Sequence, residues 1–282
     1  MAIRIADTAT VDPGADLADD VEIGPYCVVG PDVRLGAGTR LTAHVCLLGV
    51  VRMGDRNRVG PFSVIGSDPT PGRSPGRVEI GDDNAIREGA SIEAGSDSGP
   101  EAGTRIGSRN LLGPHVAISG NASIEHDVLL GAGARLGMMA KIESFAQLTA
   151  GVDVHPAATV GEHAFAGGPA RVFRDIPRYM LVDGRSAKVR SINLIGLKRR
   201  GFSRTSIRSL REAHRLIYRA GLDLNAAANR LVDLGQMTPE VIRLLESLHA
   251  QRSGRHGRAR ETLRRSPETV EATVGQGKRP VG

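Results

Sequence analysis

Residues 106–136 read IGSRNLLGPHVAISGNASIEHDVLLGAGARL, with an aliphatic residue at every sixth position. The same spacing extends toward both ends of the chain, with two breaks in phase. A hexapeptide repeat is typical of a parallel β-helix, in which each coil is a triangle of three short strands. The inward-facing positions are expected to be Ile5, Val11, Leu17, Ile23, Val29, Leu35, Leu41, Leu47, Met53, Val59, Ile65, Ile80, Ile86, Ile92, Ile106, Leu112, Ile118, Ile124, Leu130, Leu136, Ile142, Leu148, Val154, Val160, Ala166 and Val172.

The composition agrees with a solenoid. Aromatic residues are 3% of the 282 residues and tryptophan is missing, whereas a globular core usually depends on aromatic rings. Cys27 and Cys46 lack the spacing of metal ligands, so we expect inert thiols, no metal and no cofactor. The sequence contains no GxSxG, phosphate-loop or dinucleotide motif. It shows no signal-peptide pattern and no apolar run of membrane-spanning length, so a cytoplasmic protein is expected.

The net charge of +6 is concentrated in the last part of the chain, from Arg171 onward. A basic excess attracts nucleic acid, phosphate groups or acidic proteins. Because aromatic residues are not interleaved with the basic ones and no nucleic-acid motif is present, we expect a phosphate group or an acidic protein as the partner and no nucleic acid.

Three parts of the chain are distinguished by pattern. Residues 1–178 are predicted to form the β-helix, interrupted by loops at 66–76 and 94–103, where the hexads fail and proline, glycine and serine gather. Residues 179–250 are predicted to be α-helical, and residues 251–282 are expected to be a basic, disordered tail because they contain few large apolar side chains.

The helical part has recognisable start signals. Ser203 or Thr205 can cap a first helix, Asp223 precedes a second, and Thr238-Pro-Glu opens a third, with apolar residues at helical spacing after each. We expect these helices to pack together against the β-helix.

Several short motifs lie on this framework: GLKRRGFS at 196–203, IGPY at 23–26, RVEIGD at 77–82, NLL at 110–112 and LIYR at 216–219. On these motifs the chain resembles, over about residues 1–250, the UDP-N-acetylglucosamine O-acyltransferase family that begins lipid A synthesis. The resemblance implies a mainly β fold, a left-handed parallel β-helix with a C-terminal α-helical domain. It also implies a cytoplasmic homotrimer with active sites in the grooves between neighbouring β-helices.

A member of that family moves a 3-hydroxyacyl group from acyl carrier protein to the 3-hydroxyl of the sugar nucleotide, without a metal. The resemblance implies a histidine that acts as general base, oriented by an aspartate. In this chain the base falls on Gly120 and the aspartate on Asn121, while Ala117 and Met139 stand where the family has two further histidines. General-base assistance is commonly worth about 100- to 10,000-fold in rate, and glycine cannot supply it.

Other family positions match. His155 falls where the family has an active-site histidine. Gly168 matches a position of the groove that, in the family, limits the length of the acyl chain. Asn193, Arg199 and Arg200 match positions that touch the nucleotide, and adjacent arginines suit a pyrophosphate. Gly120 and Met139 are expected to line the same substrate site. Ile195, however, stands where the family has a nucleotide-side glutamate, which indicates an altered specificity.

Two histidines are candidates to replace the missing base. His155 is favoured by its alignment with the family site, and His115 precedes Gly120 by five residues. His126 lies in Glu-His-Asp but six residues beyond Gly120, and hence on the next side of the triangle.

The sequence therefore predicts an acyltransferase-like protein that acts on a nucleotide-linked amino sugar. The acyl thioester is carried by acyl carrier protein or coenzyme A, and the acceptor is a hydroxyl or an amine of the sugar. Two alternatives stay open. One is a relative with different chemistry on a nucleotide sugar or small molecule in a specialised biosynthetic pathway. The other is a non-catalytic protein that binds a nucleotide sugar.

Overall fold

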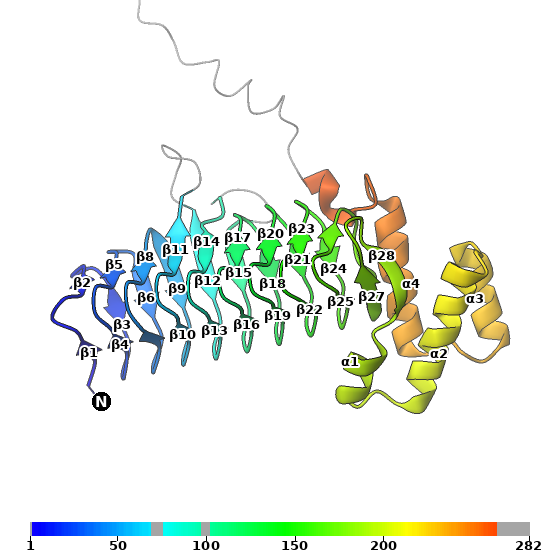
Figure 1. Cartoon of the computed structure of the whole chain (residues 1–282), viewed down its shortest axis with the longest axis horizontal. Helices are drawn as coiled ribbons and strands as arrows, with labels where there is room; N and C mark the ends of the chain where they lie inside the picture. The colour runs from blue at the N-terminus through cyan, green and yellow to red at the C-terminus, as the bar shows by residue number, and fades with distance from the viewer. Residues whose placement is uncertain (1, 69–75, 97–101, 264–282) are drawn as a thin grey trace, which may run out of the picture.

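The computed structural model describes residues 2–68, 76–96 and 102–263. It shows a long three-sided coil with a group of helices at its C-terminal end (Figure 1). Parts of the two predicted loops, and residues 264–282 of the predicted tail, lie outside the described residues.

The strands of the coil form three sheets, one on each side of the triangle. Sheet A contains β1 (Arg4–Ile5), β4 (Glu22–Ile23), β7 (Arg40–Leu41), β10 (Arg58–Val59), β13 (Ala85–Ile86), β16 (Leu111–Leu112), β19 (Leu129–Leu130), β22 (Gln147–Leu148), β25 (Phe165–Ala166), β27 (Met180–Asp183) and β28 (Lys188–Ile192). Sheet B contains β2 (Thr10–Val11), β5 (Val28–Val29), β8 (Cys46–Leu47), β11 (Val64–Ser67), β14 (Ser91–Glu93), β17 (Ala117–Ile118), β20 (Arg135–Leu136), β23 (Asp153–Val154) and β26 (Arg171–Val172). Sheet C contains β3 (Asp16–Leu17), β6 (Val33–Leu35), β9 (Val50–Met53), β12 (Arg77–Ile80), β15 (Thr104–Ile106), β18 (Ser123–Ile124), β21 (Lys141–Ile142) and β24 (Thr159–Val160).

Neighbouring strands of a sheet are parallel and in register, so residues of one side stack from coil to coil. Ile118 pairs with Leu136, which pairs in turn with Val154, and all three side chains are at most 1% exposed. The hexad aliphatics form one continuous core in this way, except that Ile5, Val11 and Leu17 of the first coil are incompletely covered. Sheet A ends differently, because β27 and β28 pair antiparallel and lead the chain out of the coil.

The chain turns between sheets at three corners, which we name after the sheets that they join: the A–B, B–C and C–A corners. Many turns hold a residue with a positive φ, such as His115 at the A–B corner, Asn121 at the B–C corner and His163 at the C–A corner. Because side chains at one corner stack over the same turn of the next coil, each corner is a column of residues that runs along the coil.

The helices are α1 (Leu194–Arg199), α2 (Arg204–His214) continued by the π-helical η1 (Arg215–Arg219), α3 (Leu224–Asp233), α4 (Pro239–Ser253) and the 3-10 helix η2 (Ala259–Leu263). Ser203 caps α2 by accepting a bond from the N–H of Ser206, and Asp223 caps α3 in the same manner. Thr238 precedes α4 but makes no side-chain capping bond. The helices share a second apolar core with Tyr179, Met180 and Ile192 from the end of the coil.

The expected tail differs from the structure at its beginning. Helix α4 continues to Ser253, and residues 254–263, here called the C-terminal arm, fold back onto the coil. Arg258 of the arm is only 7% exposed and donates a 2.7 Å hydrogen bond to the carbonyl of Phe173. The N–H of Ala259 donates to the carboxylate of Asp175 at 2.8 Å. Polar contacts hold the arm, so a low apolar content did not reveal it.

Among the described residues, no helix combines the length and apolarity that a membrane crossing requires.

Candidate functional site

The predicted site residues lie at all three corners of a single chain. Gly120, Met139 and His155 follow strands of sheet B and therefore belong to the B–C corner. The remaining residues divide between the A–B corner, with His115 and Gly168, and the C–A corner, beside which lie Asn193, Arg199 and Arg200. One chain does not bring the predicted set together.

The B–C corner at Gly120 is covered by the chain that follows β14. A Cβ atom on Gly120 would lie 2.7 Å from the carbonyl oxygen of Ala94, so this position has no room for a side chain unless Ala94 moves. Asn121 holds Ser96, two residues further along the same segment, because its Oδ1 accepts the N–H of Ser96 at 2.8 Å and its Nδ2 donates to Ser96 Oγ at 3.1 Å. Gly120 and Asn121 together hold residues 94–96 against the B–C corner, because Gly120 leaves space for Ala94 and Asn121 bonds to Ser96.

Glu93 brings a carboxylate to the same place. Its Oε2 accepts the backbone N–H of Gly120 at 3.1 Å, while its carbonyl oxygen accepts the hydroxyl of Thr104 at 2.8 Å. The side chain is half-buried, at the end of β14. Glu93 is not among the site residues predicted from the sequence.

His155 lies two coils further along the B–C corner, about 10 Å from the level of Gly120 at the usual spacing of strands. Its ring centroid is 5.9 Å from that of Phe173, and its Nδ1 is 3.1 Å from the carbonyl oxygen of Pro156. Met138, on the coil between, is 52% exposed. This part of the corner is an apolar surface with one half-buried imidazole.

The C-terminal arm closes the far end of the B–C corner. Arg260 Nε donates to the carbonyl oxygen of Met139 at 3.3 Å. Asp175 joins arm and coil, since it accepts the N–H of Thr159 at 2.7 Å as well as that of Ala259. Burial raises the pKa of the Asp175 carboxyl, although these two hydrogen bonds act in the opposite direction. The exposed part of the corner therefore ends near His155 and Phe173.

The C–A corner presents the arginine pair. Arg199 is the last residue of α1 and Arg200 its C-cap, where positive charge complements the helix dipole, and both side chains are exposed. The Arg200 guanidinium lies 4.5 Å from the centroid of the Phe145 ring. The side chain of Asn193 is 5% exposed and bonds within the chain, accepting from the N–H of Gly196 and donating to the carbonyl of His163.

His163 anchors the helical part at this corner. Its ring stacks on Phe145 with centroids 4.7 Å apart and meets Phe202 edge-on at 4.9 Å. Burial, together with nearby Arg200 and Arg243, lowers the pKa of His163 to about 4. A neutral ring in this cluster stabilises the junction of coil and helices.

Both residues at the A–B corner have a local structural role. The ring of His115 covers Gly89 of the preceding coil so closely that a side chain there would overlap it. Gly168 packs against the carbonyl oxygen of Ala150 with no space for a Cβ. The structure explains how His115 and Gly168 pack at this corner. The catalytic role of His115 and the binding role of Gly168 stay predictions.

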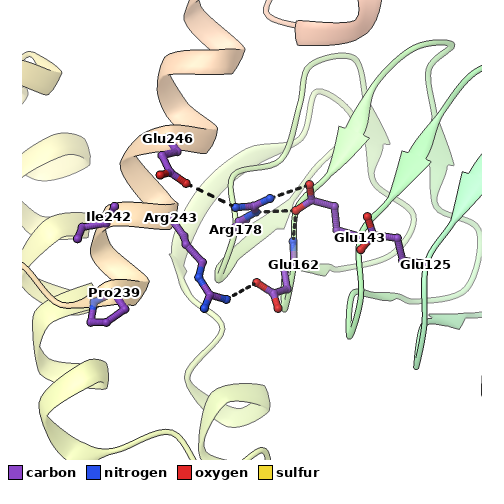
Figure 2. A pocket seen from close by; sticks show the side chains of 8 residues that line it. All are labelled: Glu125, Glu143, Glu162, Arg178, Pro239, Ile242, Arg243 and Glu246. Carbon is purple, nitrogen blue, oxygen red and sulfur yellow. Dashed lines mark hydrogen bonds and ion pairs between the residues drawn. The ribbon is translucent and has the colours of Figure 1, made fainter. Parts of the chain in front are cut away.

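A mixed-charge pocket of about 580 Å³ lies between the C–A corner and α4 (Figure 2). Glu143 binds Arg178 through two hydrogen bonds of 2.7 and 3.1 Å, and Arg243 pairs with Glu162 at 3.4 Å. No sequence motif predicts this pocket, because the residues that line it are far apart in the chain. Carboxylates and guanidiniums pair across the pocket, so these ion pairs join the coil to helix α4.

Within the described residues no group of histidine, cysteine, aspartate and glutamate is arranged to hold a metal.

Comparison with known proteins agrees with the motifs. A family model described as UDP N-acetylglucosamine O-acyltransferase, domain 2, matches residues 175–257. An acyl-[acyl-carrier-protein]–UDP-N-acetylglucosamine O-acyltransferase of Saccharophagus degradans is 39% identical over 253 residues, covering 88% of this chain and 96% of the relative. A protein of the same name from Stutzerimonas stutzeri is 36% identical over 250 residues, covering 87% and 96%.

Solved structures show the same architecture. A UDP-N-acetylglucosamine acyltransferase from Bacteroides fragilis has a TM-score of 0.82 at 29% identity, with 87% of this chain and 96% of that chain covered. An enzyme of the same family from Acinetobacter baumannii has a TM-score of 0.81 at 31% identity, with the same coverage.

The fold defines a left-handed β-helix transferase, and the comparisons confirm the predicted class, mainly β with a C-terminal α-helical region. More particularly, the chain belongs to the UDP-N-acetylglucosamine O-acyltransferase family, which confirms the resemblance found in the sequence.

Proposed function

We propose that this chain transfers an acyl group from the thioester of acyl carrier protein to a hydroxyl of UDP-N-acetylglucosamine. The observation that carries the proposal is the similarity to the Saccharophagus and Stutzerimonas acyltransferases, which spans nearly their whole length. Acyl-coenzyme A is the second donor to be tested, since it presents the same kind of thioester.

The nucleotide is proposed to bind at the arginine pair. Arg199 and Arg200 are exposed and adjacent, and each guanidinium offers a planar fork of donors that suits the oxygens of a pyrophosphate. The stacking of Arg200 on Phe145 restricts that side chain before the ligand arrives, which reduces the entropy lost on binding.

The working form is proposed to be a homotrimer. In one chain the arginine pair lies beside the C–A corner, whereas Gly120, Met139 and His155 lie at the B–C corner. Copies related by a three-fold rotation contact each other through two different surfaces, so the C–A corner of one copy would meet a different part of its neighbour. A second copy would thus complete the site.

The test is incubation with UDP-N-acetylglucosamine and 3-hydroxyacyl carrier proteins of several chain lengths, followed by mass spectrometry of the sugar nucleotide. The expected product is heavier by one acyl group. Replacing Arg199 and Arg200 together by alanine is expected to raise KM for the nucleotide about 100-fold, the magnitude of two lost charged hydrogen bonds. Absence of product with every carrier and coenzyme A donor would refute the proposed transfer.

A non-catalytic binder is the second candidate, and one observation favours it. The position that the resemblance assigns to the base has no room for a side chain, because Ala94 covers it. Calorimetry separates the two candidates, since a binder would take up UDP-N-acetylglucosamine without turnover. A relative with other chemistry on a nucleotide sugar would yield a different product mass.

A further inference from the structure

We infer that Glu93 is the proton acceptor at the B–C corner, held in place by the backbone N–H of Gly120. The inference rests on the proposed function and adds a catalytic residue to it. Glu93 would act as the general base, a role that the resemblance assigns to a histidine at position 120, where this chain has glycine.

The register of sheet B places Glu93 beside Gly120. Strands β14 and β17 pair Ser91 with Ala117 and Ile92 with Ile118, so the segments that follow the two strands leave sheet B side by side. The Glu93 carboxylate then reaches across the turn to the Gly120 N–H at 3.1 Å. A general base must come within about 3 Å of the oxygen that bears the proton, and a carboxylate fixed at the corner is better placed for this than one free in solvent.

The neighbouring residues keep this arrangement in place. Gly120 leaves space for Ala94, and Asn121 holds Ser96 by two hydrogen bonds. The N–H of Asn121 also donates to Thr104 Oγ1 at 3.0 Å, where the loop returns to the coil. The pair that stands in place of a histidine and an aspartate therefore serves to position the segment that carries Glu93.

The accepting atom is available on the carboxylate itself. In the described part of the chain only Oε2 takes a hydrogen bond, from Gly120, so Oε1 keeps its lone pairs for an incoming hydroxyl proton. The two histidines predicted as bases are less well placed. His155 is two coils away, and His115 lies over Gly89 at the A–B corner.

Glu93 removes the proton of the acceptor hydroxyl as its oxygen attacks the carbonyl carbon of the thioester. The new C–O bond forms, the C–S bond breaks as the carbonyl re-forms, and Glu93 returns the proton to the departing sulfur. The products are the acylated sugar nucleotide and the free thiol of the carrier.

The test compares Glu93→Gln with the wild type and with Glu79→Gln, a control whose carboxylate lies on sheet C and pairs with Arg77. Glutamine keeps an oxygen for the Gly120 N–H but cannot accept a proton. We expect kcat to fall at least about 100-fold, KM for UDP-N-acetylglucosamine to stay within about twofold, and the acid limb of the pH–kcat profile to disappear. Glu93→Asp, which retains a carboxylate, is expected to keep that limb, as is His155→Gln.

Each outcome is decisive. A Glu93→Gln variant with wild-type kcat and an unchanged pH profile overturns the inference while the proposed function stands. A wild type without turnover, although it binds the nucleotide, overturns both. Loss of the acid limb in His155→Gln rather than in Glu93→Gln assigns the base to His155 and also overturns the inference. If Glu93→Gln fails to fold, the pH profiles of Glu93→Asp and His155→Gln still decide between the two residues.

Discussion

The B–C and C–A corners use the same kind of turn, with a positive φ, for opposite purposes. At the C–A corner His163 is packed between Phe145 and Phe202, and burial keeps it neutral. At the B–C corner the equivalent turn holds Asn121, which binds backbone and hydroxyl groups of Ser96. A histidine at a corner of this coil is therefore not in itself a sign of catalysis. A polar turn that fixes a carboxylate is better suited to proton transfer.

The largest effect on stability is expected at the aromatic corner. His163→Ala removes a ring that is 8% exposed, so the free energy of unfolding should fall by about 3 kcal/mol. The matched control is His44→Ala, since His44 stacks between Tyr26 and Phe62 at an exposed site and should cost under about 1 kcal/mol. Urea denaturation measures both. Equal losses would mean that the C–A corner is no more buried than the exposed stack.

Acid should weaken the C–A corner in particular. The pKa of His163 in the folded protein is lowered from 6.5 to about 4, so its neutral ring contributes stability that is complete above pH 6.5 and is lost as the pH falls toward 4. Between pH 7 and pH 5 the loss should be about 2 kcal/mol. His163→Phe removes this titration, so the variant should lose about 2 kcal/mol less than the wild type over the same interval. Parallel losses would show that His163 protonates as readily when folded as when unfolded.

A smaller effect is expected at the polar corner. Gly120→Ala puts a Cβ 2.7 Å from the Ala94 carbonyl, which should cost about 1–2 kcal/mol and speed amide exchange in residues 93–96. The control is Gly167→Ala, where the nearest atom, Asp183 Oδ1, is at 3.4 Å and little change is expected. Unaltered exchange at residues 93–96 would mean that Gly120 does not seat the segment.

The repeat made the coil predictable because every sixth side chain is buried at the same place in each turn. Position counting failed at the B–C corner for a physical reason. Residues of one column usually stand eighteen apart, as Ala117 and Arg135 do, but the loop after β14 widens this spacing to 26 between Ser91 and Ala117, and Glu93 bonds to Gly120 27 positions further along the chain. The C-terminal arm escaped prediction because Arg258 and Asp175 hold it through hydrogen bonds, which leave no apolar pattern.

The site could be predicted only in part. The resemblance predicts that Arg199 and Arg200 bind the nucleotide; both are exposed beside the C–A corner, and their role stays a prediction. The roles of His155, His115 and Gly168 stay predictions, since their surroundings explain their packing without a substrate.

A crystal structure of the protein with UDP-N-acetylglucosamine tests the central claim most directly. We expect an acceptor hydroxyl oxygen about 2.6–3.2 Å from the Glu93 carboxylate, with the pyrophosphate on the arginine pair of a neighbouring copy. A sugar bound with its hydroxyls beside His155 and out of reach of Glu93, or a nucleotide held by the arginines and the B–C corner of one and the same chain, would contradict it.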